Sequence, residues 1–285
     1  MASKNILASP HAKIISRYCR YFLALDLILI CIFVYVWYSL CNGSFCINTV
    51  SSKSKTNILA FGDSITRGHV KHYPRTYYPY SESLRKTLNR LHAKDVTFIV
   101  DNYGVNGDKA LGTAETRLAS ALKSKQYEWI IILIGTNDLG SYFKYHDDQE
   151  KYKNSTVFIE ALFAKIKKLC SMALGTNALV ILGTIFAHTC EERSSYCESL
   201  SINRQSLNKK LRDYVFDTRE LLILADFDND LCYRKLSEEK RKLYWQDDVH
   251  LTEAGYERMA KLIYQKMLPY LPEMVQQQSQ IKSQK

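Results

Sequence analysis

Apolar runs of strand length alternate with amphipathic runs of helix length along most of the chain. Each of five short apolar runs is followed by a longer segment in which apolar residues recur every three or four positions, the spacing of one helix face. The predicted strands cover residues 57–60, 96–100, 129–134, 178–185 and 221–226, and the predicted helices cover residues 79–92, 113–125, 154–174, 200–216 and 252–267. Strands that alternate with helices favour a parallel sheet with helices on both faces.

The central elements show the two periodicities most clearly. Residues 129–134 read WIIILI, an uninterrupted apolar run that is typical of a strand buried on both faces of a parallel sheet. Residues 154–174 carry an apolar stripe at helical spacing, and Thr252 is a suitable N-cap for the last helix. No internal repeat or second domain interrupts the pattern, so we predict one α/β domain over residues 57–272.

One further apolar run, residues 21–40, lies outside this alternation. Its sequence, YFLALDLILICIFVYVWYSL, contains a single charge at Asp26. As a helix it would span about 30 Å, the thickness of the hydrocarbon core of a bilayer. Aromatic residues stand near both ends, and the cations that precede the run favour a cytosolic N-terminus. The run therefore predicts a transmembrane helix in a single-pass type II membrane protein.

This topology assigns a role to every part of the chain. The predicted parts are a cytosolic segment (1–20), the transmembrane anchor (21–40), a stem (41–56), a lumenal or extracellular domain (57–272) and a flexible tail (273–285). A cleaved signal peptide, which would give a secreted protein, and a buried core helix are the alternatives for the apolar run. Asn42 and Asn154 begin Asn-x-Ser/Thr sequons and are glycosylation candidates in this topology.

Composition and charge narrow the class of protein. The chain is 46% hydrophobic and 24% charged, which is typical of a globular protein and not of a disordered one. Its net charge is +10, but the Lys and Arg residues are scattered and no nucleic-acid-binding motif appears. We interpret the charge as a basic solvated surface and predict no nucleic-acid partner.

Cysteine positions add a redox expectation. Six of the eight cysteines follow the apolar run, and in an oxidising compartment some of them should pair. Cys190 and Cys197 are the favoured disulfide, and Cys41 with Cys46 is the second. A zinc site formed by His188, Cys190 and Cys197 is an alternative, although the spacing matches no common zinc finger. We predict no metal and no organic cofactor.

Four polar blocks follow the predicted strands or lie near the C-terminus in a fixed order. The first is Phe61-Gly62-Asp63-Ser64-Ile65-Thr66-Arg67-Gly68, directly after the first predicted strand. The other three are Asn102-Tyr103-Gly104-Val105-Asn106-Gly107-Asp108, Gly135-Thr136-Asn137-Asp138 and Asp247-Asp248-Val249-His250-Leu251-Thr252. Polar residues just past the ends of parallel strands lie where α/β proteins place their binding and catalytic groups.

The four ordered blocks resemble those of the SGNH (GDSL) hydrolase family, over roughly residues 57–270. The resemblance implies a three-layer α/β/α sandwich of flavodoxin-like type and a serine esterase or lipase-like activity. The chain contains no G-x-S-x-G nucleophile elbow, the motif of a different hydrolase fold.

The residue types in these blocks suit acyl transfer through a serine. Ser64 is the candidate nucleophile, and a serine hydroxyl needs a base within hydrogen-bond reach. His250 is the candidate base and later the acid, and Asp247 can orient and stabilise its imidazole. Asp248 is an adjacent substitute, but the family's Asp-x-x-His pattern assigns the role to Asp247.

The oxyanion of a tetrahedral intermediate also needs donors fixed in advance. The resemblance points to the backbone N–H groups of Ser64 and Gly107 and to the side-chain amide of Asn137. Gly104 is an alternative donor. Val105 and Asn106 stand where the family more often has small residues or serine, so the geometry of this oxyanion hole is less certain than that of the triad.

The function predicted from these residues is a membrane-anchored hydrolase of a small ester, either a lipid or an acylated sugar. The alternatives within enzymes are an O-acyltransferase and a carbohydrate O-deacetylase with the same triad. A non-catalytic binding domain that kept the fold is a further alternative, and intact residues in all four blocks argue against it.

Overall fold

The computed structural model describes residues 31–32, 53–71, 76–92, 96–144, 149–187, 189–192, 195–218 and 221–271. The predicted anchor (apart from Cys31 and Ile32), Asn42, the Cys41–Cys46 pair and the tail at 273–285 lie outside these residues. The chain divides into two compact units, Met1–Ser52 and Lys53–Lys285. Within the described ranges, no helix is long and apolar enough to cross a membrane.

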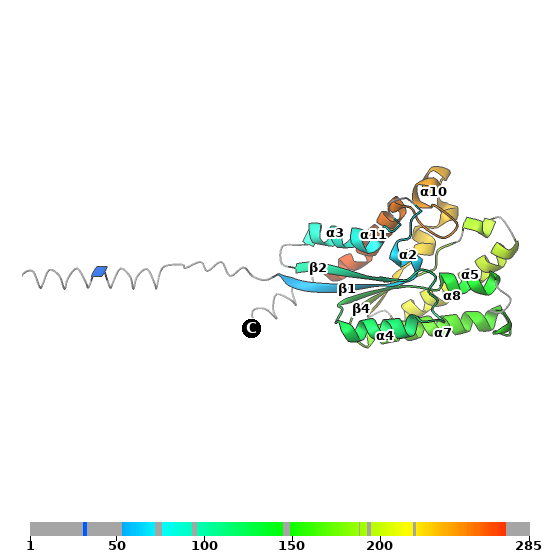
Figure 1. The fold of residues 1–285 in the computed structure, drawn as a ribbon, viewed down its shortest axis with the longest axis horizontal. Helices are drawn as coiled ribbons and strands as arrows, with labels where there is room; N and C mark the ends of the chain where they lie inside the picture. The colour runs from blue at the N-terminus through cyan, green and yellow to red at the C-terminus, as the bar shows by residue number, and fades with distance from the viewer. Residues whose placement is uncertain are drawn as a thin grey trace, which may run out of the picture. The chain divides into compact units, whose positions relative to one another are not determined.

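The second unit is built on one parallel sheet of five strands in the order β2-β1-β3-β4-β5 (Figure 1). The strands are β1 (Ser54–Gly62), β2 (Val96–Gly104), β3 (Trp129–Leu133), β4 (Leu179–Gly183) and β5 (Leu222–Ala225). All five strands were predicted near these positions, and every pairing between them is parallel. β1 begins at Ser54, inside the predicted stem.

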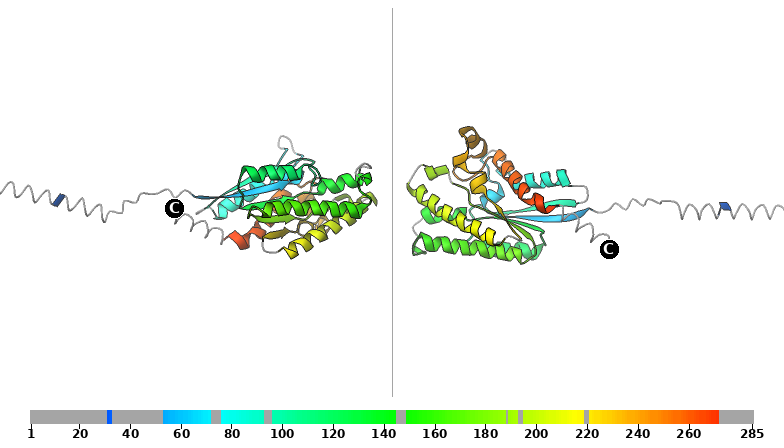
Figure 2. Two further views of the ribbon diagram at one scale, coloured as in Figure 1. Left: turned by 90° about the horizontal axis from the view of Figure 1, so that it is seen from below. Right: turned by 180° about the vertical axis from the view of Figure 1, so that it is seen from behind.

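Helices cover both faces of the sheet, which confirms the predicted three-layer α/β arrangement (Figures 1 and 2). The long helices are α3 (Tyr80–His92) and α11 (Glu253–Met267) on one face, and α4 (Ala114–Ser124), α7 (Ser155–Leu174) and α8 (Ser195–Asp217) on the other. Successive side chains of β1 alternate between the two cores, with Ile58 and Ala60 in one and Leu59 and Phe61 in the other. This alternation fixes which face of the sheet each side chain of β1 meets, and the first polar block begins at the end of this strand.

Side-chain caps set two of the predicted helix starts. The Asn154 side chain accepts a hydrogen bond from the N–H of Val157 at the start of α7, and Thr252 accepts one from Gly255 at the start of α11. The sequence pattern missed the shorter helices, which are α2 (Ser64–Arg67), α5 (Thr136–Lys144), α9 (Phe227–Asp230) and α10 (Glu238–Tyr244). Helices of nine residues or fewer give too few apolar repeats to reveal a period, and α5 immediately follows a glycine.

A disulfide joins Cys190, in the short 3-10 helix Thr189–Glu192, to Cys197 in the first turns of α8. The Cα atoms of the two cysteines are 5.8 Å apart. The bond uses both thiols that the alternative zinc site would need, so that alternative is wrong. No cluster of three or more His, Cys, Asp or Glu side chains suited to a metal ion occurs in the described part of the chain.

Candidate active site

The strand register brings the first three polar blocks to one edge of the sheet. Gly62 at the end of β1 pairs with Gly104 at the end of β2 on one side and with Leu133 at the end of β3 on the other. The residues that follow these three strands therefore leave the sheet at the same edge. The fourth block lies in the loop between α10 and α11 and meets this edge from outside the sheet.

Ser64 is the first residue of the four-residue helix α2, directly after β1. Asp63 caps this helix through a hydrogen bond of 2.9 Å from the N–H of Ile65 to its Oδ1 atom. Gly68 ends the helix in the left-handed conformation, with φ of 78°. The chain therefore turns sharply at both ends of α2, and the Ser64 side chain is held at the end of a buried strand.

Ser64, His250 and Asp247 form a continuous hydrogen-bonded chain. The Oγ atom of Ser64 is 2.9 Å from Nε2 of His250, and Nδ1 of His250 is 3.1 Å from Oδ2 of Asp247. The neighbouring Asp248 carboxylate instead accepts a hydrogen bond from the Thr189 hydroxyl. Asp247, and not Asp248, is thus the acid that faces the imidazole.

The Asp247 carboxylate is held in its charged form. Burial alone would raise its pKa, but hydrogen bonds from the backbone N–H groups of His250 and Val249 and from the imidazole of His250 place the pKa well below the usual range. Lys71 adds an ion pair of 3.1 Å to Oδ2. A permanently charged Asp247 can stabilise a positive charge on His250.

His69 is a second imidazole at this site, to which the sequence gave no special weight. Its ring packs edge to face against His250, with ring centroids 4.8 Å apart and planes inclined by 62°. Burial and the neighbouring His250 lower the pKa of His69. Its backbone carbonyl accepts hydrogen bonds from Gln246 and Tyr256, which fix the backbone of His69 beside His250. The only signal in the sequence was its position five residues after Ser64.

Two of the predicted oxyanion donors, Gly107 and Asn137, follow β2 and β3, and Asn137 lies in the first turn of α5. Gly107 has φ of 73°, and a side chain there would meet nothing within 4 Å, so the backbone is open on that side. The Asn137 amide donates to the Asp108 carbonyl at 2.9 Å, which leaves its second N–H hydrogen for another acceptor. The N–H of Gly104 is engaged by the Asn102 side chain at 2.9 Å, which removes the alternative donor.

Arg117 from α4 ties the β1 and β2 loops together, a role that sequence reasoning missed. Its Nε donates to the Asp108 carboxylate at 2.9 Å, and its terminal nitrogens donate to the carbonyls of Tyr103 and Gly62 at 2.9 and 3.0 Å. Nothing in the apolar periodicity of α4 distinguishes this arginine from a solvated one. It holds the loop that carries Gly107 next to the end of β1.

Two buried carboxyls lie beneath the site. Burial raises the pKa of Asp63 to about 7, and the nearby charges of Asp138 and Asp108 add to that rise. Burial also raises the pKa of Asp138 to about 6, although the N–H groups of Leu111 and Ala110 oppose the shift. Asp138 accepts hydrogen bonds from both of these N–H groups, at 2.9 and 2.8 Å, and so supports the loop after β2.

The residues that depart from the family pattern lie at the rim of the site. Val105 is 38% exposed, and its N–H donates to the Gly62 carbonyl. The Asn106 amide donates to the Tyr77 hydroxyl at 3.2 Å. His188, which was named in the alternative zinc site, lies outside the described residues.

Comparison with known proteins gives one family match and several structural matches. The model of the GDSL-like lipase/acylhydrolase family matches residues 58–263. The crystal structure of Axe2, an acetylxylan esterase from Geobacillus stearothermophilus, shares 19% identity and a TM-score of 0.56, over 75% of this chain and 95% of that one. A lipolytic G-D-S-L protein from Veillonella parvula shares 22% identity and a TM-score of 0.51, over 74% and 97% of the two chains. No curated protein matches the chain.

The structural matches are similar to this chain in fold, and the family match extends over most of the domain built on the five-stranded sheet. The chain therefore belongs to the GDSL-like lipase/acylhydrolase family and is an esterase.

Proposed function

We propose that this esterase is a serine hydrolase that removes a short acyl group, such as acetyl, from an acylated sugar. The observation that carries the proposal is the hydrogen-bonded chain from Ser64 through His250 to Asp247, with distances of 2.9 and 3.1 Å. These are hydrogen-bonding distances in the order that general-base activation of a serine requires.

In the proposed mechanism His250 takes the proton of Ser64 as Oγ attacks the ester carbonyl. The new C–O bond gives a tetrahedral oxyanion, which the N–H groups of Ser64 and Gly107 and the Asn137 amide stabilise. His250 then protonates the departing sugar oxygen and leaves Ser64 acylated. A water molecule attacks the acyl-enzyme with His250 again as base, which releases the carboxylic acid and restores the serine.

The acylated-sugar substrate is supported by the structural neighbour Axe2, an acetylxylan esterase. Its catalytic mutants replace a serine, an aspartate and a histidine, which are the residue types that meet here. A sugar hydroxyl in place of the attacking water would turn the same chemistry into O-acyl transfer, so the assay must measure acetate release and not only substrate loss.

We also propose that the esterase is a type II membrane protein, anchored through residues 21–40 with its domain lumenal or extracellular. The apolar run and the cations before it support this proposal. Alkaline carbonate extraction and glycosidase treatment of the expressed full chain test it. Retention in the membrane and a mobility shift lost in Asn42→Gln and Asn154→Gln are expected, whereas a secreted or unmodified chain would contradict it.

A fluorophosphonate probe tests the nucleophile directly. Full-length wild-type protein should be labelled covalently, and Ser64→Ala should not, whereas the exposed α7 serine variant Ser171→Ala should label like the wild type. Acetate release from acetyl esters should vanish in Ser64→Ala and His250→Ala. A folded wild type that neither labels nor releases acetate would refute the proposal and favour a non-catalytic binding domain.

A further inference from the structure

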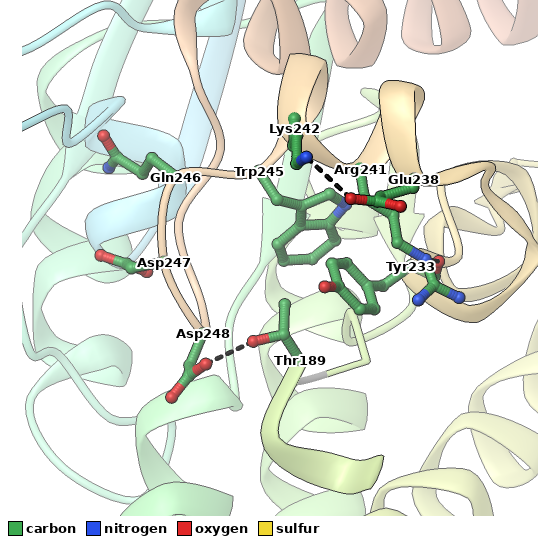
Figure 3. Close-up of a pocket in the computed structure, with 9 residues that line it drawn as sticks. All are labelled: Thr189, Tyr233, Glu238, Arg241, Lys242, Trp245, Gln246, Asp247 and Asp248. Atoms are coloured by element: carbon green, nitrogen blue, oxygen red, sulfur yellow. Dashed lines mark hydrogen bonds and ion pairs between the residues drawn. The ribbon is translucent and has the colours of Figure 1, made fainter. Parts of the chain in front are cut away.

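A pocket of about 400 Å³ lies beside the loop that carries Asp247 and His250 (Figure 3). Asp247 and Asp248 line one side of it, and Tyr233, Trp245 and Glu238 line the other. In Figure 3 the Asp247 carboxylate points away from the two aromatic rings, so the pocket adjoins the acid–base loop without containing the triad hydrogen bonds. Its size falls in the range of small-molecule sites, roughly 300–1,000 Å³.

The aromatic wall of this pocket is rigidly supported. The rings of Tyr233 and Trp245 meet edge to face with centroids 5.8 Å apart, and Phe186 packs against Trp245 from the core at 5.8 Å. The Arg241 guanidinium lies 4.5 Å from the Tyr233 ring centroid, and its Nε donates to the carbonyls of Tyr233 and Leu236. The wall is therefore already formed and need not be ordered by a ligand.

The indole N–H of Trp245 gives this wall an unpaired polar group. Trp245 is 7% exposed, and its Nε1 atom is buried without a hydrogen-bond partner among the described residues. A buried donor without an acceptor is costly and rare in folded proteins. Glu238 and Lys242 form an ion pair at the rim beside the indole, and their side chains are 80% and 76% exposed. Such an exposed pair is weak and can move aside for a ligand.

The lining chemistry specifies a neutral, hydroxyl-rich ligand. A hydroxyl group can accept a hydrogen bond from the indole N–H and can also donate to the carboxylates of Glu238 or Asp248. A long acyl chain would leave the indole N–H unpaired, and an acidic sugar would meet a lining with three carboxylates (Glu238, Asp247 and Asp248) against two cations (Arg241 and Lys242). The two aromatic side chains add apolar edges of the kind that pack against a sugar ring.

We propose that this pocket is a subsite for a neutral sugar unit adjacent to the unit whose ester reacts at Ser64. This inference rests on the proposed esterase function and assigns to it an oligosaccharide substrate that extends over the acid–base loop. A monosaccharide ester would occupy the Ser64 site alone, whereas a longer chain would also contact Trp245 and Glu238.

Kinetics of full-length protein on two acetyl esters test the subsite. The substrates are acetylated xylotriose, which would reach the pocket, and acetylated xylose, which would not. We expect Trp245→Phe to lower the ratio of the two kcat/KM values about tenfold, the effect of one lost hydrogen bond. Glu238→Gln should lower the same ratio about threefold, while Glu239→Gln, an exposed neighbour in the first turn of α10 that does not line the pocket, should leave it within about twofold of wild type.

A binding measurement separates the subsite from the chemistry. In the Ser64→Ala background, titration calorimetry with acetylated xylotriose should show weaker binding when Glu238→Gln or Trp245→Phe is added. If the wild type cleaves acetylated xylose but shows no advantage for xylotriose, or if Glu238→Gln and Glu239→Gln behave alike, the subsite is refuted and the esterase proposal stands. If neither ester is cleaved, the esterase proposal fails first.

Discussion

The proposed nucleophile and its proposed base are held in opposite ways. Ser64 follows a strand whose residues from Ile58 to Phe61 are fully buried, and Asp63 directly before it is also fully buried. His250 and Asp247 instead lie in a short loop, and each side chain is 20% exposed. The position of the nucleophile is thus a property of the whole sheet, whereas the position of the base is a property of one loop.

The loop obtains its order from local contacts. Trp245 and Leu251 form an antiparallel bridge at its base, and the Asp247 carboxylate accepts hydrogen bonds from the N–H groups of Val249 and His250 at 2.9 and 2.7 Å. The segment just after α2 reaches across to it, because His69 packs on the base and Lys71 pairs with the acid. Substitutions in the loop should therefore change activity more than stability, and substitutions around β1 should do the reverse.

Asp247→Asn should give the largest effect, and that effect should be a loss of activity. The asparagine can keep the hydrogen bonds from the loop N–H groups, but its NH₂ would face Nδ1 of His250 and favour the wrong tautomer. We expect kcat to fall by about 10³–10⁴-fold, as in other serine triads. The melting temperature should fall by only a few degrees, because no core contact is lost and only the charge that the loop N–H groups stabilise is removed.

Steady-state kinetics and calorimetry on the same preparation check this pair of expectations. Asp230→Asn, at the end of α9, is the control for the loss of one carboxylate. A decrease of less than tenfold in kcat would mean that Asp247 does not support the base.

Asp63→Asn tests the nucleophile side of the comparison. Asp63 lies directly before Ser64, and its titration changes the stability of the fold. Its pKa is raised from the ordinary value of 3.8 to about 7 in the folded state, so the folded protein binds the proton more tightly than the unfolded chain. Its contribution is fully present below about pH 4 and is lost as the pH rises to about 7. Between pH 5 and 8 the wild type should lose roughly 3 kcal/mol from this group, and Asp63→Asn should not.

Urea denaturation at pH 5 and pH 8 measures the difference. Asp213→Asn removes an exposed carboxylate from α8 and should follow the wild-type pH dependence. If Asp63→Asn also follows the wild type, Asp63 is not the carboxyl that titrates with folding.

The same contrast explains what could be predicted from the sequence. The apolar runs predicted the strands of the parallel sheet, because a strand buried on both faces is apolar throughout. The polar blocks that follow these runs predicted the sheet edge near which Ser64, Gly107 and Asn137 lie. The resemblance to the family's Asp-x-x-His pattern predicted the acid–base pair, and both of its residues belong to one short loop. These are local or periodic features, which a single sequence displays.

The contacts that the sequence did not predict are those between distant segments. Arg117 lies on a helix face among ordinary polar residues, and His69 is one of several histidines after Ser64, so neither is marked by spacing. The pocket beside Trp245 combines residues from the Thr189 loop, α10 and the acid–base loop, and a set of this kind exists only once the chain is folded. Short helices such as α10 are also hard to predict from the sequence, because they contain too few apolar residues to show a helical period.

Gly104→Ala should give a moderate loss of stability, because it disturbs the packing of β2 against α2. A Cβ atom at this glycine would lie 2.1 Å from the backbone nitrogen of Arg67, and backbone cannot yield as a flexible side chain would. We expect a loss of about 1–3 kcal/mol in the free energy of unfolding. The control is Gly140→Ala in α5, where a Cβ would meet nothing within 4 Å.

That control should be neutral or stabilising by up to about 1 kcal/mol, since alanine favours a helix over glycine. Chemical denaturation measures both variants, and equal stabilities would contradict the close packing of β2 on α2. Activity per folded molecule should fall less than in Asp247→Asn, because the triad loop is untouched.

Lys71→Met should give the smallest effect and tests a charge that reaches the loop from the nucleophile side. Lys71 is 63% exposed and pairs with Asp247 at 3.1 Å, so the pair should contribute less than about 1 kcal/mol. Removing its positive charge favours the protonated form of the nearby imidazole. The acid limb of the pH profile of kcat/KM should therefore move to higher pH by less than about 1 unit, and the shift should shrink at high salt.

Lys86→Met is a matched control, since Lys86 is also 63% exposed and pairs with Glu82 on α3, away from the site. Its pH profile should coincide with that of the wild type. An acid limb that moves to lower pH in Lys71→Met would mean that the lysine acts mainly by orienting the carboxylate, because a misplaced Asp247 stabilises the imidazolium less. The direction of this small shift thus decides whether the contact between the two halves of the site is electrostatic or positional.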